Sequence, residues 1–170
     1  MTGPAGTRGP AAEPDTSTRQ RYFEDVREGE EVPGVAYPLT VYRLVMAAGS
    51  NRDFNSIHHN TEYARATGAP EMYANTGLLL GMWERAVRDW IGPAGTIRGI
   101  RGFRMRAFNV VGDTTWVRGR VASVGTDESP GGDEGPGVVD LELWCENSAG
   151  VTVGPGTVRV TLPARANRED

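Results

Sequence analysis

The sequence predicts an α+β domain in which a twisted antiparallel sheet curls around one long apolar helix. Two patterns carry this prediction. Residues 74–91 have the period of an amphipathic helix, and the segments after them alternate between apolar and polar residues, as strands do when one face meets a core. Because the helix must bury its apolar stripe, we expect it on the inner face of the sheet.

The composition is typical of a globular protein. The chain has 170 residues, of which 38% are hydrophobic and 24% charged, enough for one domain with a core. Its net charge of -4 argues against general binding to nucleic acids. No apolar run approaches the ~20 residues that cross a bilayer, and the first residues lack the apolar centre of a secretory signal. Since Cys145 is the single cysteine, we expect no intrachain disulfide and a cytoplasmic location.

The chain is predicted to hold one domain between two tails. Residues 1–19 are rich in Gly, Pro, Thr and Ala and are expected to be disordered. Residues 20–163 form the domain, and residues 164–170 are expected to fray. All 18 basic residues are Arg, which excludes Schiff-base chemistry by a lysine of this chain. Two adjacent histidines and one distant cysteine are too few ligands for a usual His/Cys zinc site, so no metal is expected.

The first elements are predicted to be short. A turn at Pro33-Gly34 precedes a strand over residues 35–39. Thr40 is placed to cap a helix over residues 41–48, in which the apolar residues fall on one face. A second short helix is predicted over residues 61–67.

The long helix is the best-defined element. Its stripe contains the residues Leu79, Met82, Trp83, Ala86, Val87 and Trp90. Residues 74–82 carry no charge, so this half is expected to be buried on nearly every side. Strands are then predicted around residues 103–107, 117–122, 139–146 and 158–162, with a mobile hairpin loop at 125–137 and a tighter turn at 147–150.

One polar loop carries the best candidates for acid/base chemistry. Asp53 and His58 lie five residues apart, just after the first predicted helix. A carboxylate and an imidazole on one loop can bind a water molecule and transfer protons near neutral pH. A lone Asp at such a place more often caps a helix or turn, and the spacing to His58 is what favours catalysis. His59 is expected to be a surface or interface neighbour.

The loop and the order of elements together resemble the MaoC-like (R)-specific enoyl-CoA hydratases and dehydratases. The signature of this family reads roughly G-D-x-N-P-I-H-x5-A, and the matching residues here are Asp53, Asn55, Ile57, His58 and Ala64. Arg52 and Ser56 stand where the family has Gly and Pro. At the start of the long helix, the sequence Asn-Thr-Gly at 75–77 replaces a His-Gly pair. This variant resembles an actinobacterial subgroup that acts on bulky acyl-CoAs, some members of which pair with a second hot-dog chain.

The resemblance implies a hot-dog fold and a reversible hydration of a trans-2-enoyl thioester to a 3-hydroxyacyl thioester, in lipid or polyketide metabolism. It implies that Asp53 takes a proton from a bound water that His58 holds. The implied substrate-binding residues are Asn55, Asn75, Thr76 and Gly77. Of these, Asn55 would fix the loop or meet the substrate, and a backbone N–H at 75–77 would stabilise the thioester oxygen. Coenzyme A or phosphopantetheine would enter only as part of the substrate, without a further cofactor.

Several alternatives stay open at this point. A hot-dog thioesterase has a signature near D-x-x-G-H-x-N-N-x-x-Y, which Asp53, His58, Asn60 and Tyr63 partly echo. In those enzymes the motif leads directly into the long helix, whereas here a short helix intervenes. A pocket-shaping subunit of a heteromeric hydratase is the other alternative, against which the retention of both Asp53 and His58 argues.

A dimer is expected, because one hot-dog unit leaves an open sheet edge. A homodimer and a heteromer both fit. Six arginines are expected on two neighbouring strands, namely Arg98, Arg101, Arg104, Arg106, Arg118 and Arg120. Most of them would face solvent, and one or two would meet coenzyme A phosphates or an acyl carrier protein. The acyl group, the carrier and the direction of the reaction are not set by the sequence.

Overall fold

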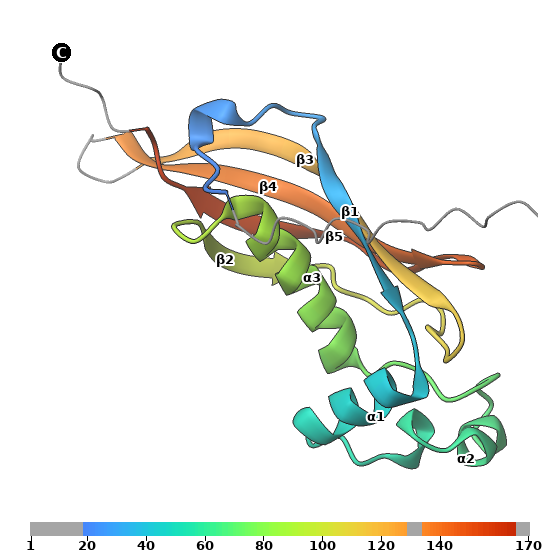
Figure 1. Cartoon of the computed structure of the whole chain (residues 1–170). Helices are drawn as coiled ribbons and strands as arrows, with labels where there is room; N and C mark the ends of the chain where they lie inside the picture. The colour runs from blue at the N-terminus through green and yellow to red at the C-terminus, as the bar shows by residue number, and fades with distance from the viewer. Residues whose placement is uncertain (1–18, 129–133, 166–170) are drawn as a thin grey trace, which may run out of the picture.

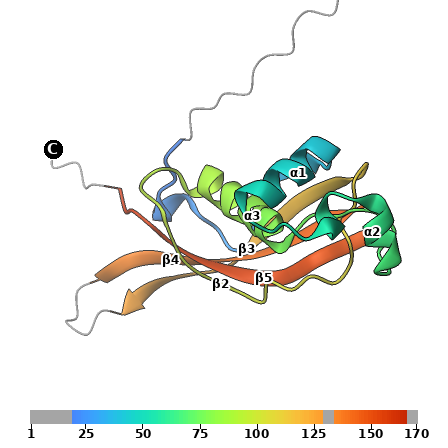
Figure 2. The same cartoon turned by 90° about the horizontal axis from the view of Figure 1, so that it is seen from below.

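The computed structural model describes residues 19–128 and 134–165, which form one antiparallel sheet with helices on one side of it (Figures 1 and 2). The described strands are β1 (Glu31–Pro38), β2 (Thr96–Arg101), β3 (Thr114–Glu128), β4 (Glu134–Asn147) and β5 (Gly150–Leu162). They pair in the order β1-β3-β4-β5-β2, so β1 and β2 are the edge strands. The predicted fold class is confirmed.

The helices lie on one side of this sheet. They are α1 (Val41–Ser50), α2 (Thr61–Ala66) and α3 (Thr76–Ile91), with short 3-10 turns η1 (Phe23–Asp25) and η2 (Ser56–His58). Figure 2 shows α1 and α3 on the same side of the sheet, with α2 beyond the start of α3. None of the helices in the described ranges is long and apolar enough to cross a membrane.

The core forms where α3 meets the inner face of the sheet. The predicted stripe of α3 is buried along its whole length, from Leu79 to Trp90. Its central residue, Trp83, is fully buried, and its indole Nε1 donates a hydrogen bond to the Cys145 Sγ of β4 at 3.1 Å. Alternate residues of β4, such as Leu141 and Leu143, complete the contact from the sheet. The period-3.6 and period-2 patterns of the sequence therefore meet in one core.

The first half of α3 is not enclosed as predicted. Gly77, Leu80 and Gly81 are exposed, although the segment carries no charge. The reason is that the sheet covers only one face of the helix, and α1 covers part of another. The helix also begins at Thr76 and not at residue 74, because Asn75 forms its N-cap.

The strand predicted at residues 103–107 is wrong. The strand that pairs with β5 is β2, and Met105 makes only an isolated bridge to Val153. Gly102 takes a positive φ of 70° and ends β2 before the alternating residues begin. Phe103 is apolar between polar neighbours for another reason: its ring packs against Trp83 in the core, with the ring centroids 5.0 Å apart. An apolar alternation can thus arise from an irregular segment that crosses a core.

The turn predicted at Pro33-Gly34 is also wrong, because both residues lie inside β1. The register shifts between Val32 and Val35, which marks a bulge. A proline is tolerated there since β1 is an edge strand, where its missing N–H breaks no ladder bond. A side chain at residue 34 would meet the Arg118 guanidinium at 2.7 Å, which favours glycine.

The six arginines expected on neighbouring strands are separated, because β4 and β5 lie between β2 and β3. Two of them pair with carboxylates of β4: Arg118 with Glu146 at 2.9 Å and Arg120 with Glu142 at 2.7 Å. The hairpin predicted at 125–137 is shorter, since β3 and β4 extend to 128 and from 134. The predicted tails fall largely on residues 1–18 and 166–170, outside the described residues.

The buried thiol of Cys145 should make stability depend on pH in the alkaline range. Burial raises the pKa of the Cys145 thiol from 9.0 to about 11. Because the folded-state pKa lies above the unfolded one, this stabilisation is complete below pH 9 and is lost as the pH rises towards 11. Two pKa units correspond to a full loss on the order of 3 kcal/mol. Urea unfolding of the wild type between pH 7.5 and 10.5 should show the loss.

The control for this measurement is Cys145→Ala. This variant should be less stable at neutral pH but should lack the thiol's share of the alkaline decline, which separates it from tyrosine titration. Equal pH profiles for the two proteins would contradict the assignment.

Candidate active site

The loop between α1 and α2 brings Asp53 and His58 into contact. The Asp53 Oδ2 and His58 Nε2 atoms are 3.0 Å apart. The Asp53 backbone N–H donates to the Ala48 carbonyl at 2.9 Å, so the chain folds back against the end of α1. His58 then closes the turn η2, where its side chain is only 6% exposed, while that of Asp53 is 40% exposed. The pair is therefore anchored through the histidine and open to solvent through the carboxylate.

The hydrogen bonds of His58 define how this pair handles protons. Its Nδ1 lies 2.8 Å from the Tyr73 carbonyl oxygen. A carbonyl only accepts, so Nδ1 carries a hydrogen, and in a neutral imidazole Nε2 is then the basic nitrogen. A hydrogen bond between Nε2 and the Asp53 carboxyl therefore requires one proton shared between the two groups. Such a pair can take a proton from a bound water and return it to a neighbouring atom.

A second contact ties the loop to the start of α3. The Asn75 Oδ1 accepts from the Leu78 N–H at 2.8 Å, which caps the helix, and from the Asn51 Nδ2 at 3.2 Å. The Asn51 amide lies so close to the helix that a Cβ on Gly77 would be 2.7 Å from its nitrogen. A side chain at 77 would therefore displace the Asn51 amide from its hydrogen bond with Asn75.

The start of α3 presents backbone donors beside the loop. The Leu78 and Leu79 N–H groups bond to Asn75. The N–H groups of Thr76 and Gly77 have no acceptor among the described residues. Unpaired N–H groups at the start of a helix, combined with the helix dipole, favour negative charge. This helix start is thus suited to an oxygen that gains negative charge.

Of the four predicted substrate-binding residues, Asn55 lies on the loop and the other three lie at the start of α3. Asn55 is exposed and caps η2 by accepting from the Ile57 N–H at 3.2 Å, so in this structure it supports the loop. Asn75 is buried, and its Nδ2 has no hydrogen-bond partner among the described residues. Thr76 is exposed and donates to the Met105 sulfur at 3.2 Å. Gly77 lines a cavity of about 300 Å³ next to the loop.

Two residues of the site were not singled out from the sequence. They are Asn51, which directly follows α1, and Tyr73, which precedes α3. Both act through tertiary contacts: Asn51 bonds to Asn75, and the Tyr73 carbonyl holds His58. The Tyr73 ring also meets the His58 ring edge-on, with centroids 5.3 Å apart. No local sequence signal reveals a backbone carbonyl that will face an imidazole fifteen residues away.

No metal cluster accompanies the pair in the residues that the structure covers. Groups of three or more His, Cys, Asp or Glu side chains placed to hold an ion do not occur in the described ranges. His59 is exposed, and its Nε2 is 3.4 Å from the Phe54 carbonyl.

The backbone at Arg52 should store strain beside the site. Arg52 has a φ of 54°, and no other non-glycine residue of the described ranges has a positive φ. A left-handed conformation costs a residue with a Cβ about 1 kcal/mol. Part of the gain on introducing glycine is offset by unfolded-state entropy. Arg52→Gly should therefore raise the free energy of unfolding by about 0.5–1 kcal/mol, as measured by urea denaturation.

Arg52→Ala is the matched control, since it removes the guanidinium but keeps the Cβ. Its stability should stay close to that of the wild type. A stabilisation of the same size in both variants would point to charge and not to backbone strain.

Loss of the Asn75 side chain should destabilise the helix and release the loop. Asn75→Ala removes both the cap and the Asn51 contact, so we expect a loss of about 1–2 kcal/mol in the free energy of unfolding. The comparison variant is Asn60→Ala, because Asn60 caps α2 through the Tyr63 N–H at 2.9 Å. Asn60→Ala should lower the free energy of unfolding by less, near the lower end of the losses usual for removal of a helix cap. A smaller effect at Asn75 than at Asn60 would refute the double role.

The chain is similar to a known hydratase subunit in sequence. No family model matches it. It is 33% identical over 81 residues to the beta subunit of 3-oxo-4,17-pregnadiene-20-carboxyl-CoA hydratase of Mycobacterium tuberculosis. The match spans 48% of this chain and 62% of the relative.

Solved structures extend the likeness over most of the chain. The ChsH1-ChsH2 complex of Mycobacterium tuberculosis matches with a TM-score of 0.70 and 25% identity, covering 80% of this chain and 98% of that one. The R-hydratase PhaJ1 of Pseudomonas aeruginosa matches with a TM-score of 0.71 and 20% identity, covering 85% and 86%. A MaoC-like dehydratase of Rhodospirillum rubrum matches with a TM-score of 0.70 and 18% identity, covering 85% of this chain and 98% of that one. The chain thus has the hot-dog fold, and its resemblance to the MaoC-like dehydratases and R-hydratases is confirmed.

Proposed function

We propose that this protein catalyses the reversible hydration of a trans-2-enoyl thioester to a 3-hydroxyacyl thioester. The observation that carries the proposal is the 3.0 Å contact between Asp53 and a His58 whose other nitrogen is fixed by the segment leading into α3. The pair supplies the proton chemistry, and the start of α3 supplies donors for a thioester oxygen. The hydratases among the similar proteins support the same reaction class.

The reaction needs one water and one proton relay. The water binds at the solvent-exposed side of the pair, next to both the Asp53 carboxylate and the His58 Nε2. Asp53 takes a proton from this water while the water oxygen forms a bond to C3 of the substrate. The electrons of the double bond move towards the thioester, whose oxygen becomes negatively charged. The proton shared by Asp53 and His58 then passes to C2, which completes the addition of H and OH.

The growing charge on the thioester oxygen is met by the Thr76 and Gly77 N–H groups. Preorganised donors of this kind are typically worth about 3 kcal/mol in the barrier. The loop and the helix must keep a fixed separation for this to work, and the Asn51–Asn75 hydrogen bond supports that. Asn75 therefore acts as a positioning residue in this mechanism.

A hot-dog thioesterase fits the chain less well. In that class the acidic motif leads directly into the long helix. Here η2 and α2 intervene between Asp53 and α3, and α1 precedes the motif.

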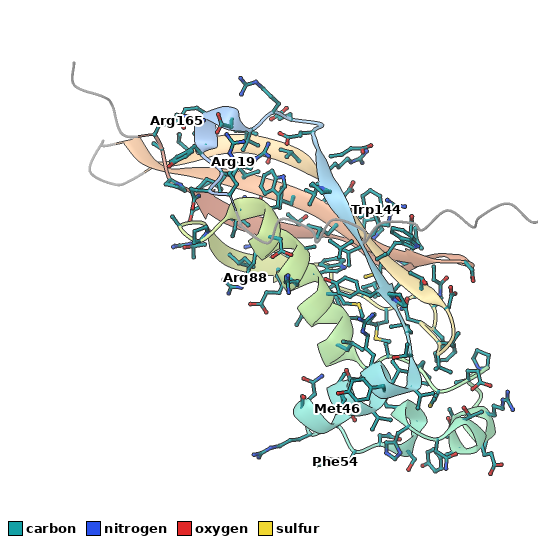
Figure 3. The ribbon with its side chains drawn as sticks, viewed as in Figure 1. Arg19, Met46, Phe54, Arg88, Trp144 and Arg165 are labelled. Atoms are coloured by element: carbon teal, nitrogen blue, oxygen red, sulfur yellow. The ribbon has the colours of Figure 1, made fainter. Side chains whose placement is uncertain are left out.

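We further propose that the substrate is carried on coenzyme A and that the chain works with a second hot-dog chain. The relative that matches in sequence is a beta subunit of a CoA hydratase, and one matching structure is a two-chain complex. The surface of α1 supports a partner, because Val41, Tyr42 and Met46 are large, apolar and half or more exposed. Phe54 of the following loop is also exposed, and Figure 3 shows its label near that of Met46 at the same end of the molecule.

Replacement of either member of the pair should stop hydration. Asp53→Asn and His58→Ala should each lower kcat by about 10²–10⁴-fold, because general acid/base catalysis contributes that much. Loss of enoyl absorbance with crotonyl-CoA reports the rate, measured on the chain together with its partner if the chain alone is inactive.

His59→Ala is the matched control, since His59 adjoins the pair in sequence but is exposed and outside the proposed mechanism. It should keep nearly all activity. Near-wild-type hydration by Asp53→Asn or His58→Ala would contradict the mechanism. Release of free thiol from a saturated acyl-CoA would instead identify a thioesterase.

A further inference from the structure

The cavity beside the helix start continues along α3. It lies between α3, α1 and β1, and Gly77, Gly81 and Arg85 line it at four-residue steps. Residues at this spacing share one face of a helix, so the cavity follows α3 over the eight-residue step from 77 to 85, or about 12 Å. Its near end adjoins the N–H groups proposed to bind the thioester oxygen. Its volume of about 300 Å³ suits one acyl group.

Gly81 keeps this cavity open. It lies inside α3, where glycine is a poor choice compared with alanine, and it does not have a positive φ. A Cβ at this position would meet no atom within 4 Å. The backbone and the packing therefore do not demand glycine, whereas a longer side chain at 81 would enter the cavity.

The far end of the cavity is polar. Tyr37 of β1 belongs to the lining, and its hydroxyl is buried without a hydrogen-bond partner among the described residues. Such an orphan group calls for an acceptor or a donor. Burial also raises the pKa of Tyr37, so the phenol stays protonated and can donate.

Arg85 lies beside Tyr37 at this end. Its Nε bonds to the Asp89 carboxylate at 2.7 Å, so a negative charge already lies beside the guanidinium, whose side chain is 67% exposed. Its terminal amino groups have no acceptor in the described part of the chain. An uncharged oxygen can accept hydrogen bonds here, while a carboxylate would meet the Asp89 charge.

We propose that this cavity binds the distal part of the acyl group, and that Tyr37 and Arg85 select an acyl chain with a ketone or hydroxyl oxygen at that end. This inference rests on the proposed function, because it places the thioester at the start of α3. The oxygen would lie about 12 Å from the thioester, the rise of eight helical residues.

Binding measured by calorimetry tests the selection without any reaction. The ligands are three saturated thioesters: decanoyl-CoA, 9-oxodecanoyl-CoA and a decanoyl-CoA with a terminal carboxylate. The wild type should bind the oxo compound about 10-fold more tightly than decanoyl-CoA, as one well-placed hydrogen bond allows, and should gain nothing from the carboxylate. Tyr37→Phe should remove the gain.

Arg88→Gln is the matched control. Arg88 lies on the same helix (Figure 3) and forms the same kind of i,i+4 ion pair, with Glu84, but it does not line the cavity. This variant should keep the gain for the oxo compound. Gly81→Leu should weaken both ten-carbon ligands by about 10-fold or more while butanoyl-CoA binds as before.

The outcomes separate the subsite from the reaction. Equal affinities of the wild type for the oxo compound and decanoyl-CoA, or a full gain in Tyr37→Phe, would overturn the subsite even if crotonyl-CoA is hydrated. The predicted affinity pattern in a protein that hydrates no enoyl-CoA would support the subsite and reject the reaction. Failure of the wild type to bind any of these thioesters would overturn the subsite.

Discussion

The burial of α3 against the inner face of the sheet is the constraint on which the rest of this structure depends. Leu79, Trp83 and Val87 are fully buried in that contact. Each such side chain contributes about 1.5–3 kcal/mol through removal of apolar surface from water. Because the helix is held this firmly along its length, its first turn has a fixed position relative to the sheet. The candidate site is assembled at that turn.

The loop that carries Asp53 and His58 takes its position from the same turn. Two hydrogen bonds connect them, one from the His58 Nδ1 to the Tyr73 carbonyl and one from the Asn51 amide to Asn75. A side chain at 77 would displace the Asn51 amide, and the loop has a strained backbone at Arg52. Strain of this kind persists where the surroundings determine the conformation, and it is common at functional sites. The loop is thus held by contacts with α3 and not by its own backbone preference.

Whether a sequence pattern predicted the right element depended on the kind of contact that produced the pattern. The stripe of α3 was predicted correctly, because a helix on a sheet buries residues at a period that the sequence displays directly. The alternation at Phe103 and Met105 was misassigned to a strand, since packing of an irregular segment over Trp83 leaves the same pattern. Pro33 was assigned to a turn, because nothing local reveals that its strand lies at the edge of the sheet. The order of the strands, which separates the arginines of β2 and β3, is likewise a long-range property.

The sequence by itself determined the fold class, the long helix and the pairing of Asp53 with His58, since each depends on residues close together in the chain. Only the tertiary structure decided which groups complete the site. The Tyr73 carbonyl, the Asn51 amide and the cavity that ends at Tyr37 and Arg85 come from segments that meet when α3 docks on the sheet. The physical reason is that a backbone carbonyl is the same for every residue type, and that a cavity is formed by segments far apart in the chain. Their roles follow from where the fold places them.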